Sequence, residues 1–295
     1  MTRVAFIGLG NMGSGMAANQ AKAGREVVAF DLNAEAVSRA AAQGMIGASS
    51  APEAVADADV IITMLPAGQH VSQVYLEAIL PNARKDALLI DCSTIDVDTA
   101  RTVARDASMQ GFRAADAPVS GGTAAAQGGT LTFMVGCREQ DFAEFEDALK
   151  PMAKAVIHAG ASGAGQAAKI CNNMLLGISM IGTCEAFVLA ESLGLDPQKF
   201  FDIASKASGQ CWSLTSYCPW PGPVPAAPSN RDYEGGFAAA MMLKDLKLAQ
   251  DAADTTGAPT PLGQAAEALY AELVNRGHAG RDFSAIIQMF RGKLT

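Results

Sequence analysis

The sequence has few aromatic residues, few histidines and no cysteine pattern typical of a bridge or a metal site. Aromatic residues make up 6% of its 295 residues, which argues against an aromatic-rich β-sandwich. The cysteines stand at positions 92, 137, 171, 184, 211 and 218, without a CxxC pair and without zinc-type spacing to histidine. We therefore expect free thiols, no metal site and a reducing cytoplasm, with a Cys211–Cys218 bridge as the less favoured alternative.

Positive charge and membrane-spanning stretches are also scarce. Lys and Arg number 22 against 30 Asp and Glu, a formal net charge of −8, so the chain repels phosphate backbones and a nucleic-acid partner is not expected. The apolar run at residues 4–9 is too short for a signal-peptide core. The longest membrane-like stretch, residues 174–184, falls short of the roughly 20 residues that a span needs, so we expect no membrane attachment.

Hydrophobic residues, in contrast, make up 49% of the chain, and their pattern changes once along it. The first part alternates apolar, β-branched runs with Ala-rich helical patterns such as residues 34–43 and 97–110, which predicts a doubly wound parallel sheet. The predicted strands are residues 3–8, 26–31, 60–65, 87–92, 112–117, 131–135 and 156–158.

After residue 160 only helical patterns remain. A long helix is predicted over residues 164–193, because that stretch holds no proline. Further helices are predicted over residues 197–206, 238–256, 261–276 and 283–291. We therefore expect an α/β domain over residues 1–162 and an all-α domain, for substrate binding and oligomerisation, over residues 163–295.

A proline-rich segment interrupts the second domain. Prolines at positions 219, 221, 223, 225 and 228 exclude helix and sheet there. An ordered surface loop is one interpretation. Because Trp212, Tyr217 and Trp220 lie beside it, a lid or a dimer contact is the other.

Residues 8–13, GLGNMG, fit the G-x-G-x-x-G pattern between a predicted strand and a predicted helix. In that context Gly8 makes a tight turn, Gly10 lets a pyrophosphate approach the backbone, and Gly13 lets helix and strand pack closely. The helix N-terminus that follows favours the negative charge of the pyrophosphate. The pattern thus predicts a Rossmann-type dinucleotide site, with Asn11 and Met12 also at the cofactor.

Asp31 ends the second predicted strand, where a carboxylate can accept hydrogen bonds from the ribose hydroxyls and repel a 2′-phosphate. Leu32 and Asn33 follow without an arginine, and Arg39, further on, is read as a solvated surface charge. The sequence therefore favours NAD over NADP. The ends of two more predicted strands should contact the cofactor, because ligands of such sheets bind at the carboxyl ends of strands. The residues at these ends are Met64, Leu65, Pro66 and Thr94. Ordinary core packing is the alternative for Met64 and Leu65.

A second turn, Ser120-Gly121-Gly122, follows the predicted strand over residues 112–117. Its hydroxyl and two bare backbone N–H groups can hold a small carboxylate, although a simple turn remains the alternative. The long helix carries Lys169 and Asn173, which share a face in apolar surroundings. Burial would lower the pKa of Lys169 toward neutrality and fit it for proton transfer. A lysine that extends to solvent is the alternative.

None of the three histidines, His70, His158 and His278, stands at a suggestive spacing from a carboxylate, which favours Lys169 as the proton carrier. Lys244 and Lys247 share a face of a later helix. They could serve an anionic ligand, but a solvated helix face explains them as well.

Taken together, these motifs resemble the β-hydroxyacid dehydrogenase family, and within it the 3-hydroxyisobutyrate branch. The matching segments are FIGLGNMG at 6–13, DAPVSGG at 116–122, GAGQAAKICNNMLLG at 163–177 and MLKDLKLA at 242–249. The stretch from Cys211 through the proline segment to Phe237 looks like the substrate-specific part of that branch.

The resemblance implies that Lys169 is the catalytic general acid/base. It implies substrate-binding roles for Ser120, Gly121, Gly122 and Asn173, and a place near the nicotinamide for Lys244, with Thr94 and the Leu65–Pro66 turn also on the cofactor. It further implies NAD-dependent, reversible oxidation of 3-hydroxyisobutyrate to methylmalonate semialdehyde, a step of valine breakdown.

Two other classes of function remain as alternatives. One is another family reaction, such as that of a tartronate or succinic semialdehyde reductase; Trp212 and Phe237 favour an apolar, methyl-bearing substrate instead. The other is a non-catalytic NAD-binding protein, which the presence of Lys169 and Asn173 argues against. The Ala-, Gly- and Leu-rich long helix predicts a homodimer or homotetramer through the second domain.

Overall fold

The chain forms two compact units, and the division between them falls inside one long helix. A computed structural model describes residues 1–294; its first unit is Met1–Lys169 and its second begins at Ile170. The sequence pattern instead changes just before that helix. The division into domains at residues 162 and 163 stays a prediction.

A nine-stranded sheet forms the centre of the first unit, with the order β3-β2-β1-β4-β5-β6-β8-β7 and β9 paired with β8. The strands are β1 (Arg3–Ile7), β2 (Glu26–Phe30), β3 (Ile46–Gly47), β4 (Val60–Thr63), β5 (Leu88–Asp91), β6 (Arg113–Asp116), β7 (Val119–Ser120), β8 (Leu131–Gly136) and β9 (Ala153–Gly160). The pairs from β3 to β6 are parallel, which confirms the predicted sheet of doubly wound type.

The far edge of the sheet departs from the all-parallel expectation. β8 runs antiparallel to β6 and to β7, and parallel to β9. The two-residue strands β3 and β7 were not expected. Strand direction depends on the partner across the sheet, which the hydrophobicity of a single run does not encode.

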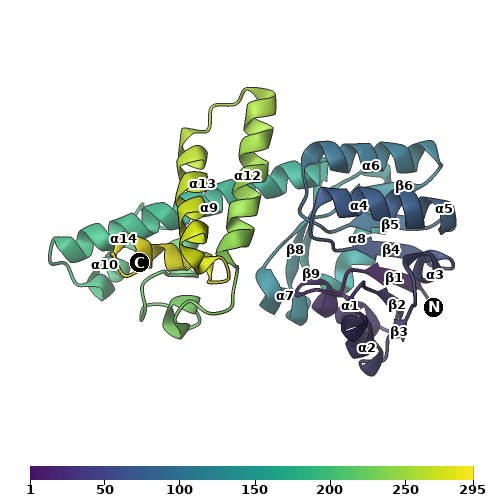
Figure 1. Ribbon diagram of the computed structural model, residues 1–295, viewed down its shortest axis with the longest axis horizontal. Coiled ribbons are helices and arrows are strands. Elements are labelled where there is room, and N and C mark those ends of the chain that lie inside the picture. Colours follow the sequence, from purple (N-terminus) through teal and green to yellow (C-terminus); the bar gives the residue numbers. More distant parts are fainter. Residues whose placement is uncertain (295) are drawn as a thin grey trace. The chain divides into compact units, whose positions relative to one another are not determined.

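Helices cover both faces of the sheet (Figure 1), because successive strand residues point to opposite sides. Val4 and Phe6 of β1 pack in one core cluster, whereas Ala5 and Ile7 pack in the other. The first cluster contains residues of α1 (Gly13–Lys22), α2 (Ala34–Ala42), α7 (Gly122–Gly128) and α8 (Phe142–Leu149). The second contains residues of α3 (Ala51–Val55), α4 (Gly68–Val74), α5 (Leu80–Asn82) and α6 (Val97–Met109).

Several helices begin at capping side chains that the sequence supplies. Asn33 Oδ1 accepts a hydrogen bond from the Glu35 N–H at the start of α2, and Asp96 Oδ1 accepts one from the Thr99 N–H at the start of α6. Each bond satisfies a backbone donor that has no partner within its helix.

Helices joined by loops, without a β-strand, make up the described residues of the second unit. Its helices are most of α9 (Ala164–Ser192), then α10 (Pro197–Ala204), α11 (Trp212–Thr215), α12 (Ala239–Thr256), α13 (Pro261–Leu273) and α14 (Ile286–Phe290). Figure 1 shows α12 and α13 side by side as a helical hairpin. Met180 and Phe187 of α9 pack in one core cluster with Leu246 of α12 and Tyr270 of α13. The helix predicted over 261–276 is α13 together with the π-helical stretch Val274–His278 that continues it, and Gly277, with φ +91°, is the first residue there with a non-helical backbone.

By length and composition α9 could cross a membrane, which the shorter stretch 174–184 had not indicated. In the structure 44% of its most apolar window is buried, and Met180, Cys184 and Phe187 belong to the core of the second unit. The six cysteines are free thiols, Cys211 and Cys218 included. Among residues 1–294, no group of three or more His, Cys, Asp and Glu side chains could hold a metal ion.

The proline-rich segment is an ordered loop held by its own polar contacts. Ser229 Oγ donates to the Cys218 carbonyl over 2.7 Å, and Tyr233 Oη donates to the Pro219 carbonyl over 2.9 Å. Trp220 stacks on Phe187 at a ring-centroid distance of 5.7 Å. Whether the loop also acts as a lid or a dimer contact stays a prediction.

Candidate active site and nucleotide pocket

The glycine turn between β1 and α1 is too tight for side chains at two of its three glycines. Gly8 has φ +99°, and a Cβ atom there would lie 2.2 Å from the Met64 carbonyl oxygen. A Cβ atom on Gly13 would lie 1.9 Å from the Gly8 carbonyl oxygen, whereas one on Gly10 would meet nothing within 4 Å. Gly8 and Gly13 are therefore required by packing, and Gly10 leaves the turn open to a ligand.

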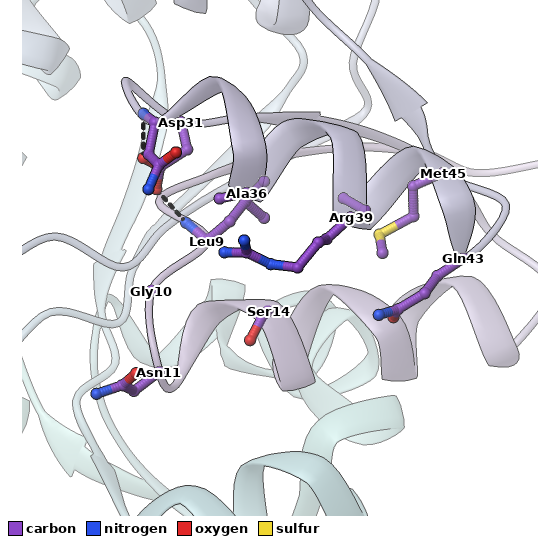
Figure 2. Close-up of a pocket in the computed structure, with 11 residues that line it drawn as sticks. Leu9, Gly10, Asn11, Ser14, Asp31, Ala36, Arg39, Gln43 and Met45 are labelled. Atoms are coloured by element: carbon purple, nitrogen blue, oxygen red, sulfur yellow. Dashed lines mark hydrogen bonds between the residues drawn. The ribbon is translucent and has the colours of Figure 1, made fainter.

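Beside this turn lies a cavity of about 460 Å³, within the ordinary size of a small-ligand site (Figure 2). It is lined by Leu9, Gly10, Asn11, Ser14, Asp31, Asn33, Ala36, Arg39, Ala40, Gln43 and Met45. Asp31 Oδ2 accepts a hydrogen bond from the Leu9 N–H over 2.6 Å, and Oδ1 accepts one from the Asn33 N–H over 2.8 Å. The carboxylate is thus fixed at the turn, and its remaining lone pairs can still accept bonds from ribose hydroxyls.

Arg39 is an exposed charge, as expected, but it also lines this cavity. Its side chain is 64% exposed and lies 3.8 Å from a carboxylate oxygen of Glu35. Figure 2 shows its guanidinium directed toward the Leu9–Gly10 turn. Residue spacing does not predict this position in the cavity. It arises because α2 follows β2 and packs beside α1, so that Arg39 lies near the Leu9–Gly10 turn.

The cavity contains only part of the predicted cofactor set. It brings together Gly10, Asn11 and Asp31, but Leu32 does not line it and is 94% exposed. Met12 is half-buried and packs against the core. Four further candidates lie outside the cavity lining, at the ends of β4 and β5: Met64, Leu65, Pro66 and Thr94. Leu65 is held there, because its N–H donates to Ser93 Oγ over 2.8 Å.

Ser120 and the two glycines after it form the turn from β7 into α7. Ser120 pairs with Thr132 of β8, and Gly121 has φ +138°. A Cβ atom on Gly121 would lie 2.6 Å from that of Ala125, so a glycine is required there. Ser120 and Gly122 are half-buried and Gly121 is exposed, so the turn is accessible to a small ligand.

The start of α9 is held by Asp116, a residue to which the sequence analysis gave no role. Asp116 Oδ1 accepts a hydrogen bond from the Gly163 N–H over 2.6 Å, and Oδ2 accepts one from the Gln166 N–H over 2.8 Å. Burial raises the pKa of Asp116 to about 6, although these backbone bonds act in the opposite direction. The sequence feature that could have indicated this role is an acidic residue at the end of a predicted strand.

Lys169 and Asn173 both lie on α9, in the first and second unit respectively. Lys169 is 7% exposed, so it does not extend to solvent. Asn173 is 2% exposed; its Nδ2 donates to Asp245 of α12, and its Oδ1 accepts from Asn172 Nδ2 over 3.0 Å. The buried Asp245, missed by the sequence analysis, therefore orients the Asn173 amide. The sequence feature that could have indicated this role is the position of Asp245 between the two lysines of the 242–249 segment.

The remaining candidates lie in the second unit. Trp212 is 51% exposed and stacks on Tyr217 at 4.8 Å between ring centroids. Phe237 is half-buried, and its ring meets Phe283 edge-on at 5.7 Å. Lys244 is half-buried on α12. The functions of these residues stay predictions.

The parallel sheet, its glycine turn and the acidic residue after β2 define a dinucleotide-binding protein of the Rossmann class. A family model described as the NAD binding domain of 6-phosphogluconate dehydrogenase matches residues 3–160. Another, described as NAD-binding of NADP-dependent 3-hydroxyisobutyrate dehydrogenase, matches residues 163–290.

The similarity to known proteins extends over nearly the full length of the chain. A 3-hydroxyisobutyrate dehydrogenase of Pseudomonas aeruginosa is 48% identical over 99% of this chain and 100% of its own. An NAD-dependent L-serine dehydrogenase of the same organism is 46% identical over 98% of both chains. The structure of Mycobacterium tuberculosis 3-hydroxyisobutyrate dehydrogenase with L-serine has a TM-score of 0.95 and 51% identity over 99% of both chains. The chain belongs to the 3-hydroxyisobutyrate dehydrogenase family within the β-hydroxyacid dehydrogenases; it is an oxidoreductase that uses NAD.

The glycine turn gives a matched pair of variants. Gly13→Ala should lower the free energy of unfolding by about 2 kcal/mol, because its methyl group overlaps the Gly8 carbonyl. Gly10→Ala should leave stability unchanged, because its methyl group meets nothing within 4 Å, but it should raise the Kd for NADH about tenfold if the pyrophosphate binds at this turn as predicted. Denaturant unfolding and fluorescence titration measure the two effects. Equal NADH affinity in Gly10→Ala and the wild type would contradict the assignment.

The raised pKa of Asp116 predicts a pH-dependent stability. Between about pH 4 and pH 6 the folded chain holds this proton more tightly than the unfolded chain, so the contribution of Asp116 to stability falls as pH rises through that window. Above pH 6 the contribution is level. The free energy of unfolding of the wild type minus that of Asp116→Asn should therefore fall by about 2 kcal/mol from pH 4 to pH 7. Parallel curves for the two proteins would refute this.

Proposed function

We propose that the chain catalyses the reversible, NAD-dependent oxidation of 3-hydroxyisobutyrate to methylmalonate semialdehyde, as in valine degradation. The observation that carries this proposal is full-length similarity, at 48% identity, to a relative named for that substrate. The burial of Lys169 supports it, because removal from bulk water favours the neutral amine that can accept a proton.

In this proposal the hydroxyl proton of the substrate goes to the Lys169 amine as the C–H bond breaks. When bound, NAD accepts the hydride, so alcohol and oxidised cofactor become aldehyde, reduced cofactor and one proton. Ser120 and the N–H groups of Gly121 and Gly122 bind the substrate carboxylate. Asn173, oriented by Asp245, binds the hydroxyl. General acid–base help of this kind contributes roughly 10²–10⁴-fold.

The residues around the 460 Å³ cavity fit the adenosine end of NAD. Gly10 leaves the turn open, the α1 N-terminus follows it, and Asp31 presents acceptors to the ribose hydroxyls. We propose that NAD is preferred over NADP because a 2′-phosphate would meet the Asp31 carboxylate. Arg39 lines the same cavity but lies near Glu35, which offsets part of its charge. Leu32, Met64, Leu65, Pro66, Thr94 and Lys244 complete the proposed cofactor set.

L-serine is a second candidate substrate, because a 46% identical relative is an NAD-dependent L-serine dehydrogenase and the solved M. tuberculosis relative was studied with L-serine. Both substrates are 3-hydroxypropanoates, and they differ at carbon 2, which carries a methyl group in one and an ammonium group in the other. An apolar surface favours the methyl group because it cannot pair an ammonium. We propose that Trp212 and Phe237 provide that surface, so 3-hydroxyisobutyrate is preferred.

We further propose that the chain is a cytoplasmic homodimer or homotetramer. Exposed leucines support association through the helical unit: Leu175 at 63% and Leu189 at 60% exposure on α9, and Leu193 at 76% just after its end. The domain division at residues 162 and 163 and the oligomerisation role of the second domain belong to this proposal.

Initial rates of NADH formation test the substrate directly. We expect kcat/KM for (S)-3-hydroxyisobutyrate to exceed the values for L-serine, D-glycerate and 4-hydroxybutyrate about tenfold or more, and NAD to exceed NADP by a similar factor. A higher value for L-serine would replace the proposed substrate with the second candidate. A higher value with NADP would show that Arg39, rather than Asp31, decides the cofactor.

Replacing the proposed base tests the mechanism. Lys169→Ala should lower kcat by about a hundredfold or more, because no other group takes the hydroxyl proton, while the Kd for NADH stays within about threefold of the wild type. Lys199→Ala, an exposed lysine of α10, is the control and should change neither. Near-normal turnover by Lys169→Ala would exclude Lys169 as the base.

A further inference from the structure

Gln166, near the start of α9, uses both ends of its side-chain amide inside the first unit. It is 0% exposed; its Nε2 donates to the Ser93 carbonyl over 2.7 Å, and its Oε1 accepts from the Ile95 N–H over 3.1 Å. Its own backbone N–H donates to Asp116 Oδ2. None of the roles derived above involves this side chain.

The two side-chain hydrogen bonds have the pattern of backbone bonds between neighbouring parallel strands. They engage the carbonyl of one residue and the N–H of the residue two positions on, as a strand partner does. The residue between them is Thr94, just beyond the end of β5. Gln166 thus fixes the main chain on both sides of a residue proposed to contact the cofactor.

Ser93 carries the same restraint to a second strand end. Its Oγ accepts from the Leu65 N–H over 2.8 Å and donates to Asp91 Oδ1 over 2.6 Å. Asp91 Oδ1 also accepts from Thr63 Oγ1 over 2.7 Å. A continuous buried network therefore joins the ends of β4 and β5 to the first turn of α9.

We propose that Gln166 is a positioning residue for the reaction, which holds Thr94 and the first turn of α9, and through it Lys169, in one fixed arrangement. Lys169 stands one helical turn after Gln166, so both lie on the same side of α9. Gln166 acts through these two residues and touches neither substrate nor cofactor. The inference rests on the roles proposed above for Lys169 and Thr94.

The effect of losing the amide follows from burial. Ser93 is 0% and Ile95 is 1% exposed, so without Gln166 a carbonyl and an N–H would stay buried and unpaired, or the turn would move to reach water. A displacement of about 1 Å at a reacting centre can cost about a hundredfold in rate. The turn that contains Thr94 and the start of α9 would then be free to shift separately.

Three variants test the proposal in the full-length protein. Gln166→Met keeps the bulk and removes both bonds; we expect the Kd for NADH to rise about fivefold or more and kcat to fall about thirtyfold or more, with KM for the hydroxy acid changed less than kcat. Gln20→Met is the matched control, because Gln20 is equally buried and bonds a main-chain carbonyl, that of Ala148, in another part of the unit. It should lower the melting temperature without changing NADH affinity or kcat.

Gln166→Glu separates positioning from general stability. An ionised Glu keeps an acceptor for the Ile95 N–H but has no donor for the Ser93 carbonyl, whereas a protonated Glu restores both. We therefore expect kcat of Gln166→Glu, relative to the wild type at the same pH, to recover about tenfold between pH 8 and pH 6. The same ratio for Gln166→Met should stay level.

The proposal is overturned if Gln166→Met keeps wild-type NADH affinity and kcat, if Gln20→Met loses as much of both, or if the Glu and Met variants follow the same pH course. NADH affinity is measured without substrate, so this outcome does not depend on the hydroxy acid. Failure of the proposed function shows separately, as normal turnover in Lys169→Ala or as a different preferred substrate.

Discussion

The hydrogen bonds from the start of α9 to the Asp116 carboxylate are the interaction on which the proposed chemistry depends. Gly163 and Gln166 donate to its two oxygens, so a strand end of the sheet fixes the position of the helix that carries Lys169. Glycine is required beside it, because a Cβ atom on Gly136 would lie 2.3 Å from Asp116 Oδ1, and one on Gly165 would lie 2.3 Å from the Met134 carbonyl oxygen. The carboxylate is costly to bury, but the helix donors need an acceptor.

The polar groups buried near this helix start share one purpose, which is to fix loops that hydrophobic packing cannot fix. Turns after β4 and β5 lie beyond the ladder, so their backbone groups have no strand partner. Ser93, Gln166 and Asp91 supply those partners from side chains. Hydrogen bonds are directional, so they fix the position of these turns more closely than apolar contacts would. Hydride transfer requires close alignment of the reacting groups.

Sequence reasoning predicted those parts of the fold that local patterns encode. The G-x-G-x-x-G turn, the parallel strands around β1 and the start of the long helix follow from residue spacing, glycine and proline alone. The antiparallel direction of β8 and the pocket position of Arg39 do not, because both depend on which element lies alongside. Asp116, Gln166 and Asp245 escaped notice for a related reason: each acts on a partner far along the chain.

The distribution of acidic residues shows how a chain of net charge −8 can accommodate two anionic ligands. The helices α2, α3, α6 and α8 carry an acidic side chain in the first turn, where it neutralises the positive end of the helix dipole. The helices that begin at the two glycine turns, α1 and α7, carry none, a feature that they share with α4 and α5 of the same unit. Their N-terminal N–H groups keep a positive potential at the turns proposed for pyrophosphate and carboxylate. Net charge therefore does not oppose these ligands, because the nearest helix ends attract them over distances at which the remaining surface charges are screened.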